Sequence, residues 1–369
     1  MKKTIIFYFA IASGFAVAQL PKPDHIVMAI FQNKGFAQIV GSTSAPYINS
    51  LIADTNTAFL TQSYALTHPS QPNYLMFYSG SNQGVTDDNI PGNTPFTTCN
   101  LGASLLASSK TFTGYSESMP SAGYLGASTS LYYRKHNPWS DWQGTGANNI
   151  PPSCNQPFTS FPTDYNLLPN VSIVVANIIN CMHDGTIQQG DTWLQNNLDG
   201  YIQWAKTHNS LFILTFDEDD SGTGNNRITT FFIGPMVAPG SYTNHVTHFN
   251  VLRTIEDIYG LPACGTSSIN TSMDFVFKSL AGINKNSLQN NINLWSASGK
   301  GIIINVGPDL FTREALISIK DLSGREIKKE KINLEAGENV VDIHNLDRGI
   351  YLVNISGNEL NFNKKISKE

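Results

Sequence analysis

The stretch that decides the fold is residues 211–220, LFILTFDEDD, in which a mostly apolar run leads directly into four acidic residues. Residues 25–33 (HIVMAIFQN) and 171–177 (VSIVVAN) likewise run from apolar residues into polar ones. Continuous apolar runs of this length are typical of strands buried on both faces of a parallel sheet. Ligands of such sheets bind beyond the carboxyl ends of the strands. The pattern predicts an α/β fold, a mostly parallel sheet flanked by helices, with a polar site at one edge.

Residues 1–18 have the pattern of a secretory signal. Lys2 and Lys3 precede an apolar stretch, and residues 16–18 (AVA) form an A-x-A cleavage site. The apolar stretch is too short to span a membrane, and no later segment qualifies. A net charge of −5 with only 14% charged residues provides no basic surface for nucleic acid. We therefore expect export through the periplasm, no transmembrane segment and no nucleic-acid partner.

The chain is expected to form two domains after the signal. Residues 19–296 alternate strand-like and helix-like segments for most of their length, which is typical of the α/β class. From residue 301 onward, short strands are separated by turn residues and lysines. This second part contains no cluster of acids, bases or metal ligands, so we expect residues 297–369 to be a small all-β sandwich.

Two helices, a strand and a long loop region are predicted within the first domain. Residues 191–208 and 249–259 have apolar side chains at helical spacing, and Gly260 is expected to end the second helix. Residues 230–233 (TFFI) are typical of a short strand. Residues 86–161 are rich in Gly, Pro, Ser, Asn and Thr, which predicts long loops or a lid over the site.

Four cysteines are present, Cys99, Cys154, Cys181 and Cys264. Disulfides are the default expectation in an exported chain. Three pairings are possible, and the preferred one joins Cys99 to Cys154 and Cys181 to Cys264. The absence of C-x-x-C spacing argues against a structural zinc site.

Residues 67–75 (THPSQPNYL) place Ser70 at a turn just before a helical run. A serine there can present its hydroxyl beside free backbone N–H groups, which also attract an anionic phosphate. The alternative is that Ser70 only caps the helix. The flanking prolines, Pro69 and Pro72, and the extra donor Asn73 favour the functional interpretation.

The four acidic residues after the 211–216 strand would repel one another unless a cation or solvent relieves them. Carboxylate oxygens suit Ca²⁺, Mg²⁺ or Mn²⁺, and together with histidine they also suit Zn²⁺ or Fe. The alternative is a solvated acidic turn. The position at the strand end favours metal ligation by Asp217 and Glu218, and not by Asp219 and Asp220.

Two histidines have neighbours that suit a phosphate site. His136 follows Arg134 and Lys135, and His183 with Asp184 lies in a loop after a sheet strand. His136 can meet a phosphate, and His183 can bind substrate or protonate a leaving group. The alternative for a lone histidine is a packed structural role.

Several motifs occur together in the order seen in one protein family: residues 31–34 (FQNK), 68–74 (HPSQPNY), 136–139 (HNPW) and 215–218 (TFDE), then His248 ahead of 252–257 (LRTIED). Over about residues 21–280 the chain resembles secreted phosphoesterases that include bacterial acid phosphatases and phosphatidylcholine-type phospholipases C. That family has the alkaline-phosphatase-like fold. Residues 317–325 (ISIKDLSGR) and 346–352 (LDRGIYL) resemble the C-terminal sorting domain of type IX secretion, which implies a secreted or surface location and the type IX machinery as partner.

The resemblance implies a divalent metal ion, Mg, Ca, Mn or Zn, held by oxygen ligands. Carried over residue by residue, the ligands are Gln32, Asn33, Ser70, Asp217 and Glu218. Family members usually have Glu where this chain has Gln32. An amide keeps the oxygen ligand but removes one negative charge, so affinity for a hard cation should be lower.

The expected function is that of a secreted, metal-dependent phosphoesterase, most simply an acid phosphatase that hydrolyses phosphomonoesters through a phosphoserine. Ser70 is the expected nucleophile, and His183 is expected to protonate the leaving group. The residues expected to bind substrate are Asn33, Lys135, His136, Asp184 and His248. The alternatives are phosphodiesterase or phospholipase C activity on the same site, or a catalytically silent surface binding protein, which Gln32 motivates.

Overall fold

The computed structural model describes residues 20–221, 225–278, 292–297, 301–306, 314–335, 337–356 and 361–368. The chain divides into two compact units, one up to Lys278 and one from Ser279. The predicted signal, residues 1–18, lies outside the described residues. Within the described part of the chain, no helix is both long and apolar enough to cross a membrane.

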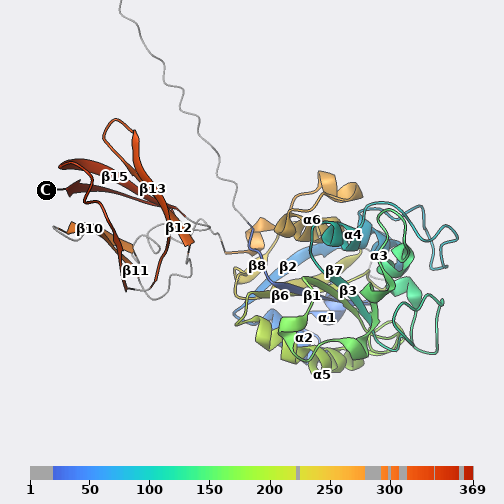
Figure 1. Ribbon diagram of the computed structural model, residues 1–369. Coiled ribbons are helices and arrows are strands. Elements are labelled where there is room, and N and C mark those ends of the chain that lie inside the picture. The colour runs from blue at the N-terminus through green and yellow to red at the C-terminus, as the bar shows by residue number, and fades with distance from the viewer. Residues whose placement is uncertain are drawn as a thin grey trace, which may run out of the picture. The chain divides into compact units, whose positions relative to one another are not determined.

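A nine-stranded sheet forms the centre of the first unit, in the order β4-β3-β5-β1-β6-β7-β2-β8, with β9 paired to β2 (Figure 1). The strands are β1 (His25–Phe31), β2 (Thr57–Tyr64), β3 (Phe112–Ser116), β4 (Asn155–Pro157), β5 (Val171–Val175), β6 (Ser210–Phe216), β7 (Arg227–Ile233), β8 (Gly240–Tyr242) and β9 (Val246–Thr247). All neighbours from β4 to β6 are parallel, whereas β7 is antiparallel to β6 and β2. The predicted mostly parallel sheet is therefore confirmed.

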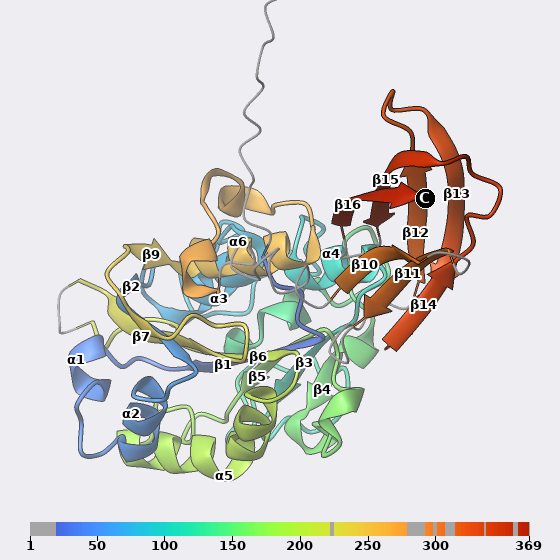
Figure 2. The same cartoon turned by 90° about the vertical axis from the view of Figure 1, so that its left-hand side faces the viewer.

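Helices cover both faces of this sheet (Figure 2). They are α1 (Phe36–Ile39), α2 (Pro46–Ile52), α3 (Ser70–Ser79), α4 (Leu101–Ala107), α5 (Ile187–Ala205) and α6 (His248–Tyr259). In β1, Ile26 and Met28 pack into the core that contains α3, α4 and α6, whereas Val27 and Phe31 pack into the core that contains α2 and α5. Burial on both faces explains why β1 is a continuous apolar run.

The two predicted helices exist, with shifted ends. Helix α5 starts at Ile187 because Thr186 and Gln189 cap each other: the Thr186 hydroxyl accepts from the Gln189 N–H, and the Gln189 side chain accepts from the Thr186 N–H. Helix α6 ends at Gly260, as expected, where φ is 65° and the backbone is left-handed.

The region predicted as loops or a lid, residues 86–161, contains helix α4 and two strands of the sheet. Strand β3 pairs with β5 along its whole length. Its sequence, FTGYS, is short and interrupted by Gly114, and glycine weakens a strand signal. The glycine is required because a Cβ at Gly114 would lie 2.0 Å from the Trp139 ring. The remaining part of the region consists of turns and short 3₁₀ helices, Arg134–His136, Pro138–Trp142, Pro152–Cys154 and Phe158–Ser160.

The second unit consists of two antiparallel sheets. One contains β10 (Ile292–Ala297), β11 (Gly301–Val306) and β14 (Gly337–Val341), and the other contains β12 (Glu314–Lys320), β13 (Glu326–Asn333), β15 (Gly349–Ser356) and β16 (Asn361–Lys368). Leu294 and Ile304 from the first sheet share one apolar core with Ile317 and Val353 from the second. This arrangement confirms the predicted all-β sandwich. Strand β10 begins before residue 297, the predicted domain start, and pairs with β11.

The preferred disulfide pairing is wrong. Cys99 is bonded to Cys264, and Cys154 and Cys181 are buried free thiols. Cys181 packs in the core that contains α5, whereas Cys264 follows α6 on the opposite face of the sheet. The sheet therefore separates Cys181 from Cys264.

We expect peptide mapping of the unreduced protein to find a Cys99–Cys264 crosslink and no other. Cys154 and Cys181 should resist a thiol reagent such as DTNB in the native protein and both react after denaturation, because burial raises the pKa of Cys154 to about 11 and also raises that of Cys181. Recovery of a Cys99–Cys154 peptide would contradict this assignment.

Gly80, which ends α3, should tolerate no side chain. Its φ is 69°, and a Cβ would lie 1.9 Å from the carbonyl oxygen of Cys264. Gly84 is the matched control, since its φ is 77° and a Cβ there would meet nothing within 4 Å. We expect Gly80→Ala to lower the free energy of unfolding by about 2–4 kcal/mol more than Gly84→Ala does, because it adds a backbone clash to the same conformational strain. Urea unfolding followed by tryptophan fluorescence measures the difference. Equal losses of unfolding free energy in the two variants would show that the backbone around Cys264 moves aside without cost.

Candidate active site

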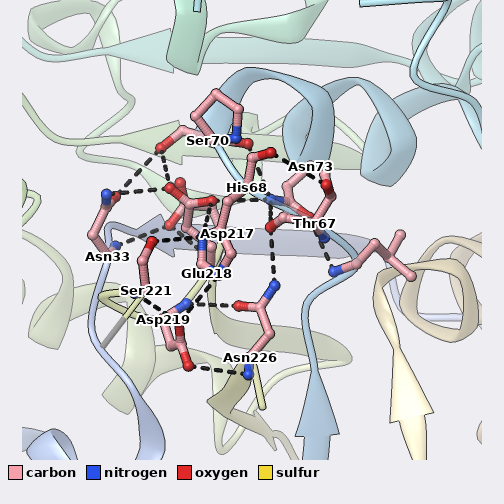
Figure 3. A network of polar contacts seen from close by, with 12 residues as sticks. Asn33, Thr67, His68, Ser70, Asn73, Asp217, Glu218, Asp219, Ser221 and Asn226 are labelled. Atoms are coloured by element: carbon pink, nitrogen blue, oxygen red, sulfur yellow. Dashed lines mark hydrogen bonds and ion pairs between the residues drawn. The ribbon is translucent and has the colours of Figure 1, made fainter. Parts of the chain in front are cut away.

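Two strand ends and one helix start meet at the edge of the sheet (Figure 3). Strands β1 and β6 are parallel and in register up to Phe31 and Phe216, so the residues that follow them are neighbours. The Asp217 N–H donates to the Phe31 carbonyl at 3.0 Å, and the Asn33 N–H donates to Asp217 Oδ1 at 3.0 Å. Helix α3 begins with Ser70 at the same place. The expectation is met for two of the three apolar runs: the polar ends of β1 and β6 lie side by side, whereas Asn177, after the third run, bonds to Glu117 and Ser118.

Ser70 directs its hydroxyl into this cluster. Its Oγ lies 3.2 Å from Gln32 Oε1, 3.3 Å from Asn33 Oδ1 and 3.0 Å from Glu218 Oε1. A hydroxyl has one proton and can donate to only one of these three acceptors at a time. The interpretation of Ser70 as a simple helix cap is wrong, because Pro69 occupies the N-cap position and no side chain caps the helix from there.

The carboxyl groups of Asp217 and Glu218 are adjacent and buried, with each residue about 2% exposed. Burial raises the pKa of both groups above ordinary carboxyl values, and the charge of Glu218 adds to the rise at Asp217. At Glu218 the Ser70 hydroxyl opposes the rise in pKa, and among more distant charges Asp88 raises the pKa while Lys135 lowers it. Two buried carboxylates so close together carry full negative charge only when positive charge compensates them.

These residues fit a divalent cation. Asp217 Oδ2 is buried and makes no hydrogen bond within the described part of the chain, which leaves a carboxylate oxygen for a ligand. Gln32 donates from Nε2 to the Tyr74 hydroxyl, and its Oε1 faces Ser70. The described residues contain no metal-competent group of three or more His, Cys, Asp and Glu side chains, so the donor set combines two carboxylates with amide and hydroxyl oxygens. All-oxygen sets of this kind favour hard cations such as Mg²⁺, Ca²⁺ and Mn²⁺.

His68 belongs to the site, although its sequence context did not single it out. Its Nδ1 donates to Glu218 Oε2 at 2.8 Å, and its Nε2 lies 3.2 Å from Asp219 Oδ1. Asn73 Nδ2 also donates to Glu218 Oε2, at 3.3 Å. These contacts hold one oxygen of Glu218, so that the other, Oε1, faces Ser70 (Figure 3). The position of His68, two residues before Ser70, was the signal in the sequence that could have pointed to it.

The predicted substrate-binding residue Lys135 lies beside the start of α3. Its ammonium group pairs with Asp88 Oδ2 at 2.7 Å, and Asp88 Oδ1 accepts from the Gln71 N–H at 3.1 Å. Lys135 is thereby connected to the residue that follows Ser70.

The predicted histidines lie at different depths. His136 is 2% exposed, burial lowers its pKa well below the ordinary value, and its ring stacks on Tyr74 and lies 5.6 Å from the His183 ring. His183 is partly exposed, and its Nδ1 donates to Asp184 Oδ1 at 2.6 Å. The rings thus connect His183 to Tyr74, which contacts Gln32. The roles expected of His136, His183 and Asp184 stay predictions.

His248 lies behind the cluster. Its Nε2 donates to the Asp217 carbonyl at 2.7 Å, its ring packs on Phe77, and burial lowers its pKa to about 4. These contacts fix the backbone of Asp217. The expected role of His248 in binding substrate stays a prediction.

Two family models match the chain. The model described as the phosphoesterase family matches residues 32–262, and the model described as a secretion system C-terminal sorting domain matches residues 298–369. The first match includes every residue of the cluster around Ser70.

Among curated proteins, the phosphatidylinositol-3-phosphatase of Mycobacterium tuberculosis is 44% identical over 254 residues, which cover 68% of this chain and 82% of that protein. The phosphate-repressible acid phosphatase of Penicillium chrysogenum is 30% identical over 227 residues, which cover 56% of this chain and 53% of that protein. The match therefore spans about half the length of the fungal protein. Among solved structures, a protein in the alkaline phosphatase superfamily from Vibrio parahaemolyticus has a TM-score of 0.49 at 11% identity, and the match covers 89% of this chain and 84% of that one.

Gln32→Glu should strengthen the binding of a divalent cation. It adds a third carboxylate without changing the side-chain length, and Tyr74 can donate its hydroxyl proton to the new carboxylate. We expect the dissociation constant for Mn²⁺, measured by titration calorimetry, to fall by about tenfold, the scale of one added unit charge near the ion. The exposed Gln188→Glu on α5 is the control for a general charge effect and should leave the constant unchanged. An unaltered constant in Gln32→Glu would exclude Gln32 from the ligand set.

Proposed function

The chain belongs to the phosphoesterase family, and we propose that it is a metal-dependent phosphatase that hydrolyses phosphomonoesters through a phosphoserine at Ser70. As a family member it is a hydrolase of phosphoric esters, and its C-terminal sorting domain directs it to the cell surface or to secretion. The observation that carries the proposal is the position of Ser70 Oγ within 3.3 Å of oxygens from Gln32, Asn33 and Glu218.

In this mechanism, Ser70 Oγ attacks phosphorus, and the Oγ–P bond forms as the ester P–O bond breaks. The hydroxyl proton leaves toward the nearest acceptor, Glu218 Oε1, at 3.0 Å. A bound divalent cation would lower the pKa of the hydroxyl and neutralise charge on the phosphoryl group. Water then attacks phosphorus, breaks the Oγ–P bond and restores the serine.

The remaining roles belong to groups around the serine. Asn33 and Lys135 can donate to the phosphoryl oxygens, which carry more negative charge in the transition state. His183 is the proposed donor of a proton to the departing alkoxide, because it is partly exposed and its Nδ1 is held by Asp184. His136 would act with Lys135, and its low pKa makes it a neutral donor or packing group rather than a cation.

The substrate is proposed to be a phosphomonoester because the relatives carry the names of phosphatases. Phosphodiester or phospholipid cleavage is the alternative on the same site. A silent binding protein is disfavoured, since the oxygens of Gln32, Asn33 and Glu218 lie within 3.3 Å of Ser70 Oγ, an arrangement that supports a role for Ser70 as nucleophile. The sorting domain, proposed to span residues 297–369, would engage the type IX secretion machinery.

Ser70→Ala should abolish turnover without unfolding the protein, since it removes the attacking oxygen and little volume. We expect hydrolysis of p-nitrophenyl phosphate to fall by at least about 10³-fold, as is typical when a catalytic nucleophile is removed. Ser79→Ala, at the other end of the same helix, is the matched control, and circular dichroism checks the fold of both variants. Substantial activity in Ser70→Ala would exclude it as the nucleophile. Running bis-p-nitrophenyl phosphate and phosphatidylcholine beside the monoester decides between phosphatase and diesterase or phospholipase C.

A further inference from the structure

The segment from Asp87 to Asn89 covers the start of helix α3, where Ser70 lies. The Gln71 side chain donates from Nε2 to the Asp87 carbonyl at 3.1 Å and to the Asn89 carbonyl at 2.6 Å. The Gln71 N–H donates to Asp88 Oδ1 at 3.1 Å. These three bonds attach the segment to the residue that follows Ser70. Ser70 and Gln71 are each only 1% exposed.

The other carboxylate oxygen of Asp88 lies beside a lysine ammonium group. Asp88 Oδ2 pairs with Lys135 Nζ at 2.7 Å, and the side chains are 33% and 14% exposed respectively. Partial burial makes this pair stronger than an ion pair on the open surface. Both charges also reach Glu218, since each contributes to its pKa.

Asp88 therefore engages two kinds of group that normally bind a phosphoryl oxygen: a backbone N–H in the first turn of a helix and a lysine ammonium. Pro72, the third residue of this helix, has no N–H, which leaves one donor fewer in the turn. A carboxylate thus occupies donors beside Ser70 that suit a phosphoryl group.

Resting on the proposed function, we propose that Asp88 is a specificity-determining residue that lowers the affinity of the Ser70 site for dianionic phosphoryl groups by competing for Lys135. A phosphomonoester or inorganic phosphate must share Lys135 with Asp88 and approach its negative charge. A phosphodiester carries one charge less and meets less repulsion. Asp88 would thereby reduce the affinity for monoesters relative to that for diesters. It would also speed the release of inorganic phosphate.

The test measures the binding of inorganic phosphate to the full-length protein by titration calorimetry in the presence of Mg²⁺. Asp88→Asn keeps an oxygen acceptor for the Gln71 N–H and removes the charge. We expect it to bind phosphate about tenfold more tightly, the scale of removing one unit charge near an anion site. The KM of this variant for p-nitrophenyl phosphate should also fall, and the fall should be larger than any change in kcat. Unchanged or weaker phosphate binding in Asp88→Asn would overturn the proposal.

Two control variants separate the charge of Asp88 from its role in holding the segment. Asp88→Glu retains the charge and should leave phosphate affinity within about twofold of the wild type. Asp87→Asn removes a charge from the exposed neighbouring side chain and should also have no effect. A gain of affinity in Asp87→Asn equal to that in Asp88→Asn would show a general charge effect and overturn the assignment.

A double-mutant cycle with Lys135→Met tests the route of the effect. If Asp88 acts mainly through Lys135, adding Asp88→Asn to Lys135→Met should bring a smaller gain in phosphate affinity than it brings to the wild type, namely the part that comes from direct repulsion by the Asp88 charge. A full gain in that background would overturn the proposed competition. Phosphate binding needs no turnover, so the outcomes are separable: a wild type that cleaves no ester refutes the proposed function alone, whereas an active wild type with an unaffected Asp88→Asn refutes this inference alone.

Discussion

Two carboxyl groups at the end of strand β6, Asp217 and Glu218, impose the main physical constraint on this protein. Both are buried and adjacent, and burial raises the pKa of each. Such a pair is stable as two carboxylates only where donors and positive charge surround it. Backbone N–H groups of Asn33 and Glu218 supply part of this compensation at Asp217 Oδ1. The all-oxygen cluster with Ser70 suits a divalent cation for the remainder.

One carboxylate oxygen of Glu218 and the backbone carbonyl of Asp217 are held by further side chains. His68 and Asn73 donate to Glu218 Oε2, and His248 donates to the Asp217 carbonyl. Asp219, which shares the acidic run, accepts from the backbone N–H groups of Ser221 and Asn226. Adjacent acidic residues in one sequence stretch therefore have different functions, because the chain turns between them: the first two face Ser70, and Asp219 secures the turn.

The site is built on rigid elements, whereas the groups over it come from long connections. Strands β1 and β6 and helix α3 position the cluster, and their packing on both sides of the sheet leaves little freedom. Asp88, Lys135 and His183 lie in connecting segments around it. In α/β enzymes the strands usually position the catalytic groups, whereas the loops usually determine which substrate is preferred. The contact between Asp88 and Lys135 lies in the loops, and we propose that it affects which substrate is preferred.

The sequence by itself determined the class of the sheet and the central residues of the site. Buried strands must be apolar throughout, and their polar ends must meet at one edge, so the residue pattern alone groups Gln32, Asn33, Asp217 and Glu218. Helix α6 and its end at Gly260 could also be predicted from the sequence, because helix caps depend on local backbone geometry. The tertiary structure alone decided the rest. Strand β3 owes its existence to pairing with β5 and to the fit of Gly114 against Trp139, and the Cys99–Cys264 bond depends on which face of the sheet each cysteine occupies. The contacts of His68 with Glu218 and of Asp88 with Lys135 join residues 150 and 47 positions apart, and only the folded chain brings such pairs together.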